Sequence, residues 1–270
     1  MINPEIHMDE LGEMEDWELE QFQNKIVSRF EKLKFEPVYH SYKLNGRKLT
    51  SVSKFIKMFE PIFDTHAKSL KKAFELGITQ EEVLAMWANS SKVSLDKGHA
   101  VHRYIECIFL KIPYDGMPLS ETQIQTCHNL YNHIYFTLGI DMVAIELRMY
   151  NEEVGLCGTC DFLGQVRSTG ELVLMDWKTN GEEPSKTSYV FDYFKQPLAG
   201  LPSTNYNKYS FQLNLYRWMI EKEFKDEIPP FLKSEIVHVT ETSFKFIETK
   251  MSNTNIMLCL DYLKKEGIKL

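Results

Sequence analysis

The chain has 270 residues, of which 43% are hydrophobic and 13% aromatic, which is ample for one large globular unit. Its 31 basic and 38 acidic side chains give a net charge of −7, which counts against a nucleic-acid binder that is basic overall but leaves room for a local basic groove. The sequence lacks an apolar run of transmembrane length and a secretory signal, and it has five cysteines, so we expect an intracellular protein without a membrane segment or a disulfide framework.

The first part of the chain predicts helices around a single hairpin. Apolar residues at helical spacing predict a surface helix over residues 9–34. Alternation over residues 37–50, with Asn45 and Gly46 at its centre, predicts a β-hairpin with a type I′ turn. Further helical patterns begin near Lys54, after a capping segment Ser51-Val52-Ser53, and cover residues 64–76 and 79–90.

Residues 95–110 carry a candidate ligand on one face of a helix. Gly98, His102 and Glu106 recur at every fourth position, so they follow one another along that face. Gly98 leaves room for another backbone or a ligand, His102 offers an imidazole to a metal, and Glu106 can bind a metal water or orient a neighbour. The alternative is a hydrogen-bonded structural histidine, and His99 lies off this face.

A helix rich in aromatic residues is predicted over residues 121–138, and a half-buried strand over residues 143–149. Glu146 falls on the polar side of that strand. It lies either near a metal or on the exposed surface, and the sequence leaves both readings open.

The next two predicted strands bring acidic side chains together. Residues 157–166 and 172–178 form a hairpin in this reading, which would place Asp161 beside Asp176. Because side chains alternate along a strand, Asp176 and Lys178 point the same way. Two carboxylates and a lysine at a sheet edge indicate a divalent-metal hydrolysis site for Mg²⁺ or Mn²⁺. The alternative is a solvated ion pair that arises by chance.

Cys157 and Cys160 form a Cys-x-x-Cys pair. A zinc site or an iron–sulfur cluster would need two further ligands nearby, whereas Cys107, Cys127 and Cys259 are scattered singly. We therefore interpret the pair as packing residues of a strand.

The segment 181–207 is a long polar and aromatic connection. Its lysines and tyrosines could hold a nucleic-acid strand through phosphate charge and base stacking, or could form an ordinary solvated loop. The residues in question are Lys186, Lys195 and Lys208, which interleave with Tyr189, Tyr193, Tyr206 and Tyr209.

The remaining chain predicts a helix over residues 209–224, with Gln212 and Tyr216 on one face. Two strands within residues 234–249 and a helix over residues 253–265 complete the prediction. We divide the chain into helices and a hairpin over residues 1–95 and a core over residues 96–270, which together form one continuous unit.

Four motifs in this order resemble the PD-(D/E)XK nuclease superfamily, in particular its RecB-like branch of phage exonucleases, mitochondrial genome maintenance exonuclease and Cas4-like proteins. The motifs are Gly98-x-x-x-His102-x-x-x-Glu106, Gly158-x-x-Asp161, Asp176-x-Lys178-Thr179 and Gln212-x-x-x-Tyr216. The resemblance covers about residues 98–220, and the hairpin followed by Ser51-Val52-Ser53 is similar to phage and mitochondrial members.

The resemblance implies an α/β (α+β) fold of the restriction-endonuclease type, in which a central mixed sheet is flanked by helices, with an N-terminal helical extension. It implies metal ligation by His102, Asp161, Asp176 and the carbonyl of Trp177. Lys178 matches the catalytic lysine, and Glu106 matches a glutamate often found after the histidine. Gln212 and Tyr216 match the motif that orients the lysine and touches DNA. The side chains expected to contact DNA are Ser51, Ser53, Lys195, Tyr206, Lys208, Tyr209, Gln212 and Tyr216. Because Cys259 is the only cysteine after Tyr216, no iron–sulfur cluster is expected.

The expected function is a Mg²⁺-dependent DNA exonuclease, for which Mn²⁺ substitutes, acting on single-stranded or frayed ends in recombination, repair or replication. The 3′ oxygen would leave and a 5′-phosphate would result. The alternatives are a flap or branch endonuclease and a DNA-binding recombination module without catalysis. The expected partners are DNA and a recombination or replication protein, without a membrane, and the likeness to phage members suggests a viral protein in a host cell.

Overall fold

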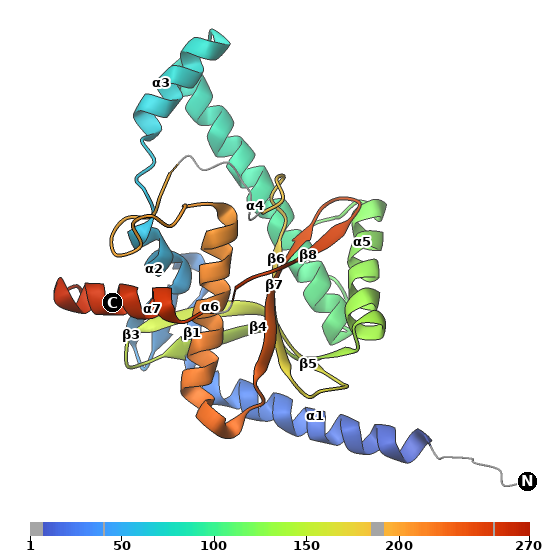
Figure 1. Cartoon of the computed structure of the whole chain (residues 1–270). Helices are drawn as coiled ribbons and strands as arrows, with labels where there is room; N and C mark the ends of the chain where they lie inside the picture. Colours follow the sequence, from blue (N-terminus) through green and yellow to red (C-terminus); the bar gives the residue numbers. More distant parts are fainter. Residues whose placement is uncertain (1–7, 40, 185–191, 251) are drawn as a thin grey trace, which may run out of the picture.

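The computed structural model describes residues 8–39, 41–184, 192–250 and 252–270. An eight-stranded mixed sheet lies at the centre and helices flank it, with a helix at the N-terminal end (Figure 1). The mixed α/β architecture predicted from the sequence is therefore confirmed.

The sheet runs in the order β1-β2-β3-β5-β6-β7-β8, and β4 pairs with the other edge of β5. Its strands are β1 (Leu33–Glu36), β2 (Ser41–Leu44), β3 (Arg47–Ser51), β4 (Ile140–Asn151), β5 (Leu156–Val166), β6 (Leu172–Lys178), β7 (Phe231–Val239) and β8 (Phe244–Glu248). The pairs β3–β5 and β6–β7 are parallel, and the others are antiparallel.

The helices are α1 (Met8–Phe30), α2 (Val52–Phe59), α3 (Thr65–Leu76), α4 (Gln80–Leu110), α5 (Glu121–Asn132), α6 (Asn205–Phe224) and α7 (Thr254–Lys265). Short helical turns are η1 (Pro37–Tyr39), η2 (His133–Thr137) and η3 (Lys225–Glu227). One helix, α4, spans both of the stretches predicted over residues 79–90 and 95–110. The division drawn at residue 95 therefore falls inside a continuous helix.

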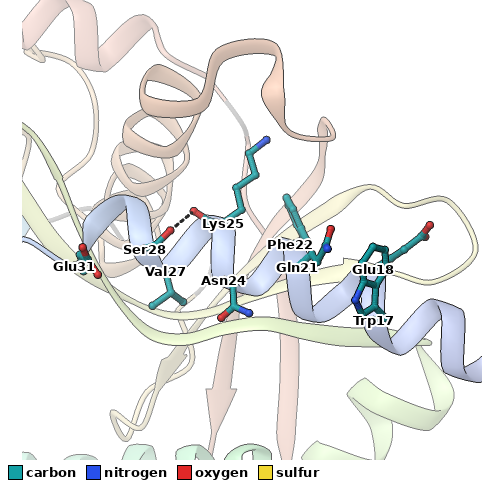
Figure 2. A pocket seen from close by; sticks show the side chains of 9 residues that line it. All are labelled: Trp17, Glu18, Gln21, Phe22, Asn24, Lys25, Val27, Ser28 and Glu31. Atoms are coloured by element: carbon teal, nitrogen blue, oxygen red, sulfur yellow. Dashed lines mark hydrogen bonds between the residues drawn. The ribbon is translucent and has the colours of Figure 1, made fainter.

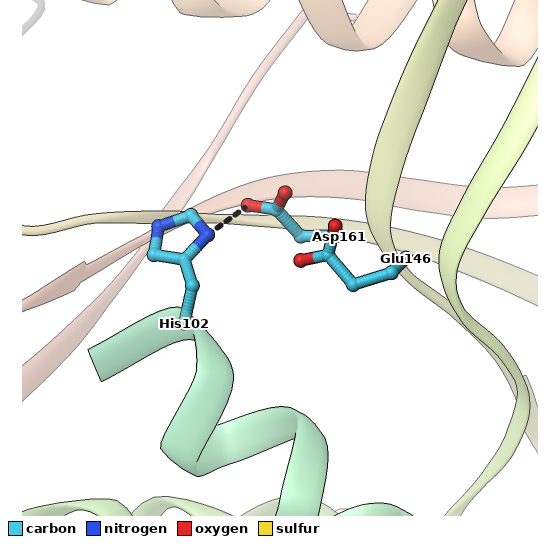
Figure 3. Close-up of side chains that lie close together, drawn as sticks. All are labelled: His102, Glu146 and Asp161. Carbon is cyan, nitrogen blue, oxygen red and sulfur yellow. Dashed lines mark ion pairs between the residues drawn. The ribbon is translucent and has the colours of Figure 1, made fainter. Parts of the chain in front are cut away.

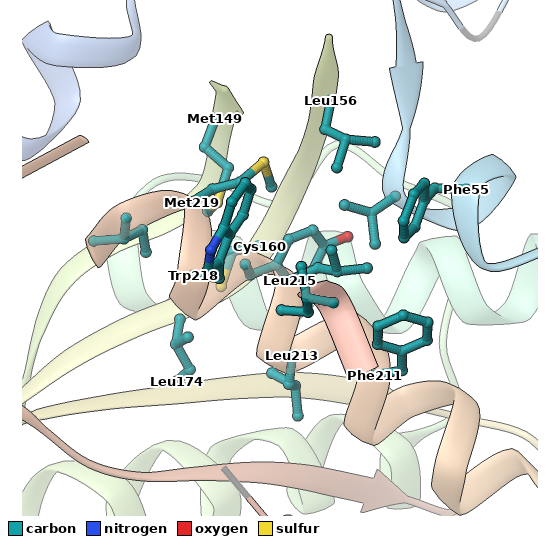
Figure 4. Close-up of a cluster of buried hydrophobic side chains, with 14 of the residues drawn as sticks. Phe55, Met149, Leu156, Cys160, Leu174, Phe211, Leu213, Leu215, Trp218 and Met219 are labelled. Atoms are coloured by element: carbon teal, nitrogen blue, oxygen red, sulfur yellow. The ribbon is translucent and has the colours of Figure 1, made fainter. Parts of the chain in front are cut away.

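The two larger of three apolar clusters cover the two faces of the sheet. Helix α6 packs on one face through side chains such as Leu213 and Trp218, together with Phe55 of α2 and Leu174 of β6 (Figure 4). Helices α4 and α5 cover the other face, where Ile105 belongs to the same cluster as side chains of β5 and β6. A sheet covered on both faces explains why β6 is an almost continuous apolar run.

The predicted hairpin exists but is shorter than expected. Asn45 and Gly46 both have positive φ, at 50° and 81°, as a type I′ turn requires. The strand begins at Ser41, because Pro37–Tyr39 form a helical turn instead. Ser51 caps α2 as predicted, by accepting a hydrogen bond from the Lys54 N–H at 3.3 Å.

Helix α1 packs along β4, where Gln23 Nε2 donates to the Met142 carbonyl at 2.7 Å. A surface hollow along α1 is lined by residues of that helix alone (Figure 2). It brings together no side chains from different elements. In the described residues, no helix combines the length and apolar character needed to cross a lipid bilayer.

A fork in the sheet determines where the polar residues gather. Strand β3 pairs with β5 up to Cys157, and β6 pairs with the same edge of β5 from Phe162 onward. Residues 158–161 lie between these two pairings, with β4 on their other side. The fork therefore opens one edge of β5 immediately before and at Asp161.

Candidate metal centre

Three side chains from three elements converge at the fork. Glu146 falls between Ile145 and Leu147, which pair with Phe162 and Cys160, so it lies opposite Asp161. His102 approaches from α4, and its Nδ1 lies 3.6 Å from Asp161 Oδ2 (Figure 3). Ligand atoms of His102, Glu146 and Asp161 all lie within 4.8 Å of one another, close enough to share one ion.

Asp176 and Lys178 form a second group beside these three. Asp176 is 1% exposed; its Oδ1 accepts a hydrogen bond from Gln212 Nε2 at 3.1 Å, and its Oδ2 is ion-paired with Lys178 Nζ. Gln212 also donates to the Tyr216 hydroxyl at 3.0 Å. The β5–β6 pairing ends at Phe162 and Met175, so Asp161 and Asp176 are the next residues on two neighbouring strands, in agreement with the predicted hairpin.

The grouping of ligands differs from the predicted set of His102, Asp161 and Asp176. Glu146 takes the third place, while Asp176 is engaged by Lys178 and Gln212. Glu146 has a φ of 49°, a left-handed conformation that is uncommon away from glycine. This irregularity within a long strand marks Glu146 as a functional candidate.

The backbone of Trp177 on β6 contacts Asp161 on β5. Its N–H donates to Asp161 Oδ2 at 2.7 Å. In a strand the N–H and carbonyl of one residue point toward the same neighbour. The Trp177 carbonyl therefore lies on the same side of β6 as its N–H, and its predicted role as a metal ligand stays a prediction.

Burial controls the charge of the site. It raises the pKa of Asp161 and of Asp176 to about 6 and lowers the pKa of His102 to about 4, so the imidazole is neutral at pH 7. Burial, followed by the adjacent Asp161 carboxylate, raises the pKa of Glu146 to about 8. Burial opposes the charge of Lys178, but the carboxylates of Asp176 and Asp161 outweigh it and raise the pKa of its ammonium.

These shifts predict a pH-dependent stability. A group whose pKa is higher in the folded than in the unfolded state loses its stabilising effect as the pH rises between the two values. The shifted pKa values of Asp161 and His102 change the stability only below about pH 6.5, whereas that of Glu146 changes it up to about pH 8. A change in stability between pH 6.5 and 8 therefore reports on Glu146. We expect the free energy of unfolding in EDTA to fall by about 1 kcal/mol between pH 6.5 and 8.

Urea unfolding at both pH values measures this change. The variant Glu146→Gln lacks the titrating group and should keep the same free energy of unfolding across the interval. An equal fall in the variant and the parent would show that Glu146 titrates normally.

Two glycines allow the elements to meet. A Cβ atom on Gly158 would lie 2.6 Å from Tyr216 Cε1, and one on Gly98 would lie 3.0 Å from Thr179 Oγ1. Gly158 thus lets α6 approach β5, and Gly98 lets α4 approach the end of β6. Both motif glycines are explained by close packing.

Glu106 lies outside the group of three possible ligands. Its carboxylate accepts a hydrogen bond from Arg103 Nη1 at 2.8 Å, and Arg103 also holds Asp115 at 2.8 Å. The ion pair with Arg103 holds Glu106 near Glu146, and the negative charge of Glu106 helps to raise the pKa of Glu146.

The residues predicted to contact DNA separate into buried and accessible ones. Tyr206 and Tyr216 are 9% and 3% exposed. The Tyr206 hydroxyl donates to the Glu248 carbonyl and the Tyr216 hydroxyl accepts from Gln212, so little of either side chain reaches the surface. Lys208 pairs with Glu60 at 3.1 Å.

The remaining predicted contacts lie at or near the surface. Lys195 and Ser53 are exposed, and Ser51 is half-buried at the cap of α2. The Tyr209 ring lies 4.5 Å from Lys178 Nζ in a cation–π contact, which places it at the catalytic lysine candidate. Lys186 and Tyr189 fall outside the described residues.

All five cysteines are buried and reduced, and Cys157 and Cys160 lie within β5. Their predicted role as packing residues is confirmed.

No protein-family description and no curated protein matches the chain. Of 15 matching chains of solved structures, one described as "Crystal structure of SSO0001" is 11% identical, with a TM-score of 0.35, and the match covers 95% of this chain and 87% of the other. A likeness at this level supports no conclusion on function.

Proposed function

We propose that this protein is a metal-dependent deoxyribonuclease that hydrolyses DNA phosphodiester bonds from strand ends. One observation carries the proposal: a neutral imidazole and two carboxylates converge within 4.8 Å, beside a lysine that is ion-paired with a buried aspartate. This combination suits hydrolysis of an anionic ester, because it joins an oxygen-rich cation site to a fixed positive charge.

The donor set fits a divalent cation. His102, Glu146 and Asp161 provide one nitrogen and carboxylate oxygens, which suit Mg²⁺ with Mn²⁺ as a substitute. Burial of two carboxylates side by side is unfavourable without a counter-charge, as the raised pKa values of Asp161 and Glu146 indicate. The bound ion would polarise the phosphate and lower the pKa of a coordinated water.

The protein's own residues position the reacting groups. Lys178 orients the attacking water and offsets the negative charge that develops on the phosphate. Asp176 keeps Lys178 charged, and Gln212 fixes the orientation of Asp176. The Tyr209 ring restrains the Lys178 ammonium from a further side. The 3′ oxygen leaves and a 5′-phosphate remains.

Digestion of DNA with a labelled end tests the proposal. With Mg²⁺ or Mn²⁺, we expect linear strands to be degraded progressively and circular single strands to be spared, and EDTA to stop the reaction. Cleavage of the circles would instead identify a structure-specific endonuclease. An absence of cleavage with either metal would reject the enzyme and favour a DNA-binding recombination module.

A further inference from the structure

A second cavity opens on the fork next to the candidate metal centre. Its volume is about 300 Å³, and it is bounded on the metal side by Glu146. Polar side chains from four strands and from α2 line it, among them Tyr42, Ser51, Ser53, Arg148 and Thr159. Ser51 and Ser53 are among the residues predicted to contact DNA, whereas Tyr42, Arg148 and Thr159 have no role in the proposed chemistry.

The strand register fixes the position of this cavity relative to the three ligands. Arg148 pairs with Thr159 across β4 and β5, two residues along from Glu146 on β4 and from Asp161 on β5. Two residues of a strand span about 7 Å. The Arg148–Thr159 pair therefore lies about 7 Å along the two strands from the Glu146–Asp161 pair.

Arg148 supplies a cation that is restrained but available. Its guanidinium lies 5.4 Å from the centre of the Phe35 ring, which restricts its position without using its N–H donors. In the described part of the chain, the arginine ion pairs all involve other arginines. An arginine that lines a polar cavity is suited to a phosphate, which it can bind through two parallel hydrogen bonds.

Hydroxyl groups line the rest of this cavity. The Tyr42 and Thr159 hydroxyls share a hydrogen bond of 2.8 Å, which holds both at the cavity. Ser51 caps α2 and Ser53 lies in its first turn, and both residues line the cavity. The wall thus combines one fixed cation with several hydrogen-bond donors, a set that favours an anion over an apolar ligand.

We propose that this cavity is a phosphate subsite that binds the nucleic-acid phosphate next to the one being cut, with Arg148 as its principal ligand. The inference rests on the proposed nuclease function and adds a substrate contact to it. The phosphate belongs either to the interior of the strand or to its end, and the cavity chemistry is the same for both.

The test measures binding without cleavage, by fluorescence anisotropy of a labelled single strand with full-length Lys178→Ala. Adding Arg148→Gln should weaken binding about 10-fold, because a charge-assisted contact is lost. It should also reduce the slope of log K against log salt by about 0.7, the amount expected for one phosphate. The control Lys265→Gln removes an equal charge from exposed α7 and should change neither quantity.

The outcomes separate the two proposals. Unchanged affinity and slope for Arg148→Gln, in a parent that binds DNA, would overturn the subsite and leave the nuclease intact. A parent that binds no nucleic acid would reject the nuclease and the subsite together. Binding to 5′-phosphorylated, 5′-hydroxyl and circular strands identifies which phosphate occupies the subsite. If it is the terminal phosphate, Arg148→Gln should weaken binding only to strands with a 5′-phosphate. If it is an internal phosphate, Arg148→Gln should also weaken binding to circles.

Discussion

Lys178→Ala is expected to reduce DNA cleavage by at least about 100- to 1,000-fold, the range found when a group that stabilises transition-state charge is removed. The structure gives the reason, because Lys178 contacts the Asp176 carboxylate and the Tyr209 ring beside the candidate metal centre. Metal binding should persist, since Lys178 is not one of the three ligand side chains. Single-turnover cleavage and calorimetry with Mn²⁺ measure the two properties separately.

The same variant should remain folded, because Asp176 can respond to the loss of its partner. Its pKa, already raised to about 6 by burial, should rise further without Lys178, so that the carboxyl group binds a proton. The variant should therefore be less destabilised at pH 5.5 than at pH 8. Asp176→Ala should also abolish cleavage, because it releases Lys178. Retained Mg²⁺-dependent activity in either purified variant would refute the site.

Asp161→Asn is expected to abolish cleavage and to weaken metal binding strongly. Asp161 is the central member of the candidate centre, since it lies opposite Glu146 and within 3.6 Å of His102. Changes around metal ligands commonly weaken affinity 10- to 100-fold, so loss of a direct carboxylate should weaken Mn²⁺ binding by at least about 100-fold. Calorimetry measures the affinity, and the cleavage assay measures the activity.

The fold should survive this substitution. The asparagine carbonyl can still accept the hydrogen bond that Asp161 receives from the Trp177 N–H. The variant should also lack the repulsion between neighbouring carboxylates, so its metal-free form should be at least as stable as the parent. The matched control Asp226→Asn, on an exposed turn, should leave binding and cleavage unchanged. Normal Mn²⁺ affinity in Asp161→Asn would place the metal elsewhere.

Local sequence patterns predicted most of the helices and strands, because the periodicity of apolar residues and the preferences of turn residues are set over a few positions. The apolar run of β6 and the Asn45-Gly46 turn are clear examples. The continuous helix α4 was less apparent, since its sequence changes from exposed to buried along its length. The fork in the sheet depends on β3 and β6 choosing the same edge of β5, which is a long-range pairing that no local pattern encodes.

The site was predictable where spacing alone brings residues together. Asp161, Asp176 and Lys178 lie on adjacent paired strands, and Gln212 and Tyr216 lie one helical turn apart. The role of Glu146 depends on its left-handed conformation, which a glutamate in an alternating pattern does not reveal. The burial of Tyr206 depends on a contact with Glu248, far along the chain.

Helix α4 joins two distant parts of the molecule. Its outer end projects from the body together with α3 (Figure 1). Apolar side chains are exposed on α3, among them Phe74, which is 91% exposed. About 33 Å farther along α4 lies His102. Because α4 is continuous, we expect a change in the direction of its outer end to move His102 at the candidate metal centre as well.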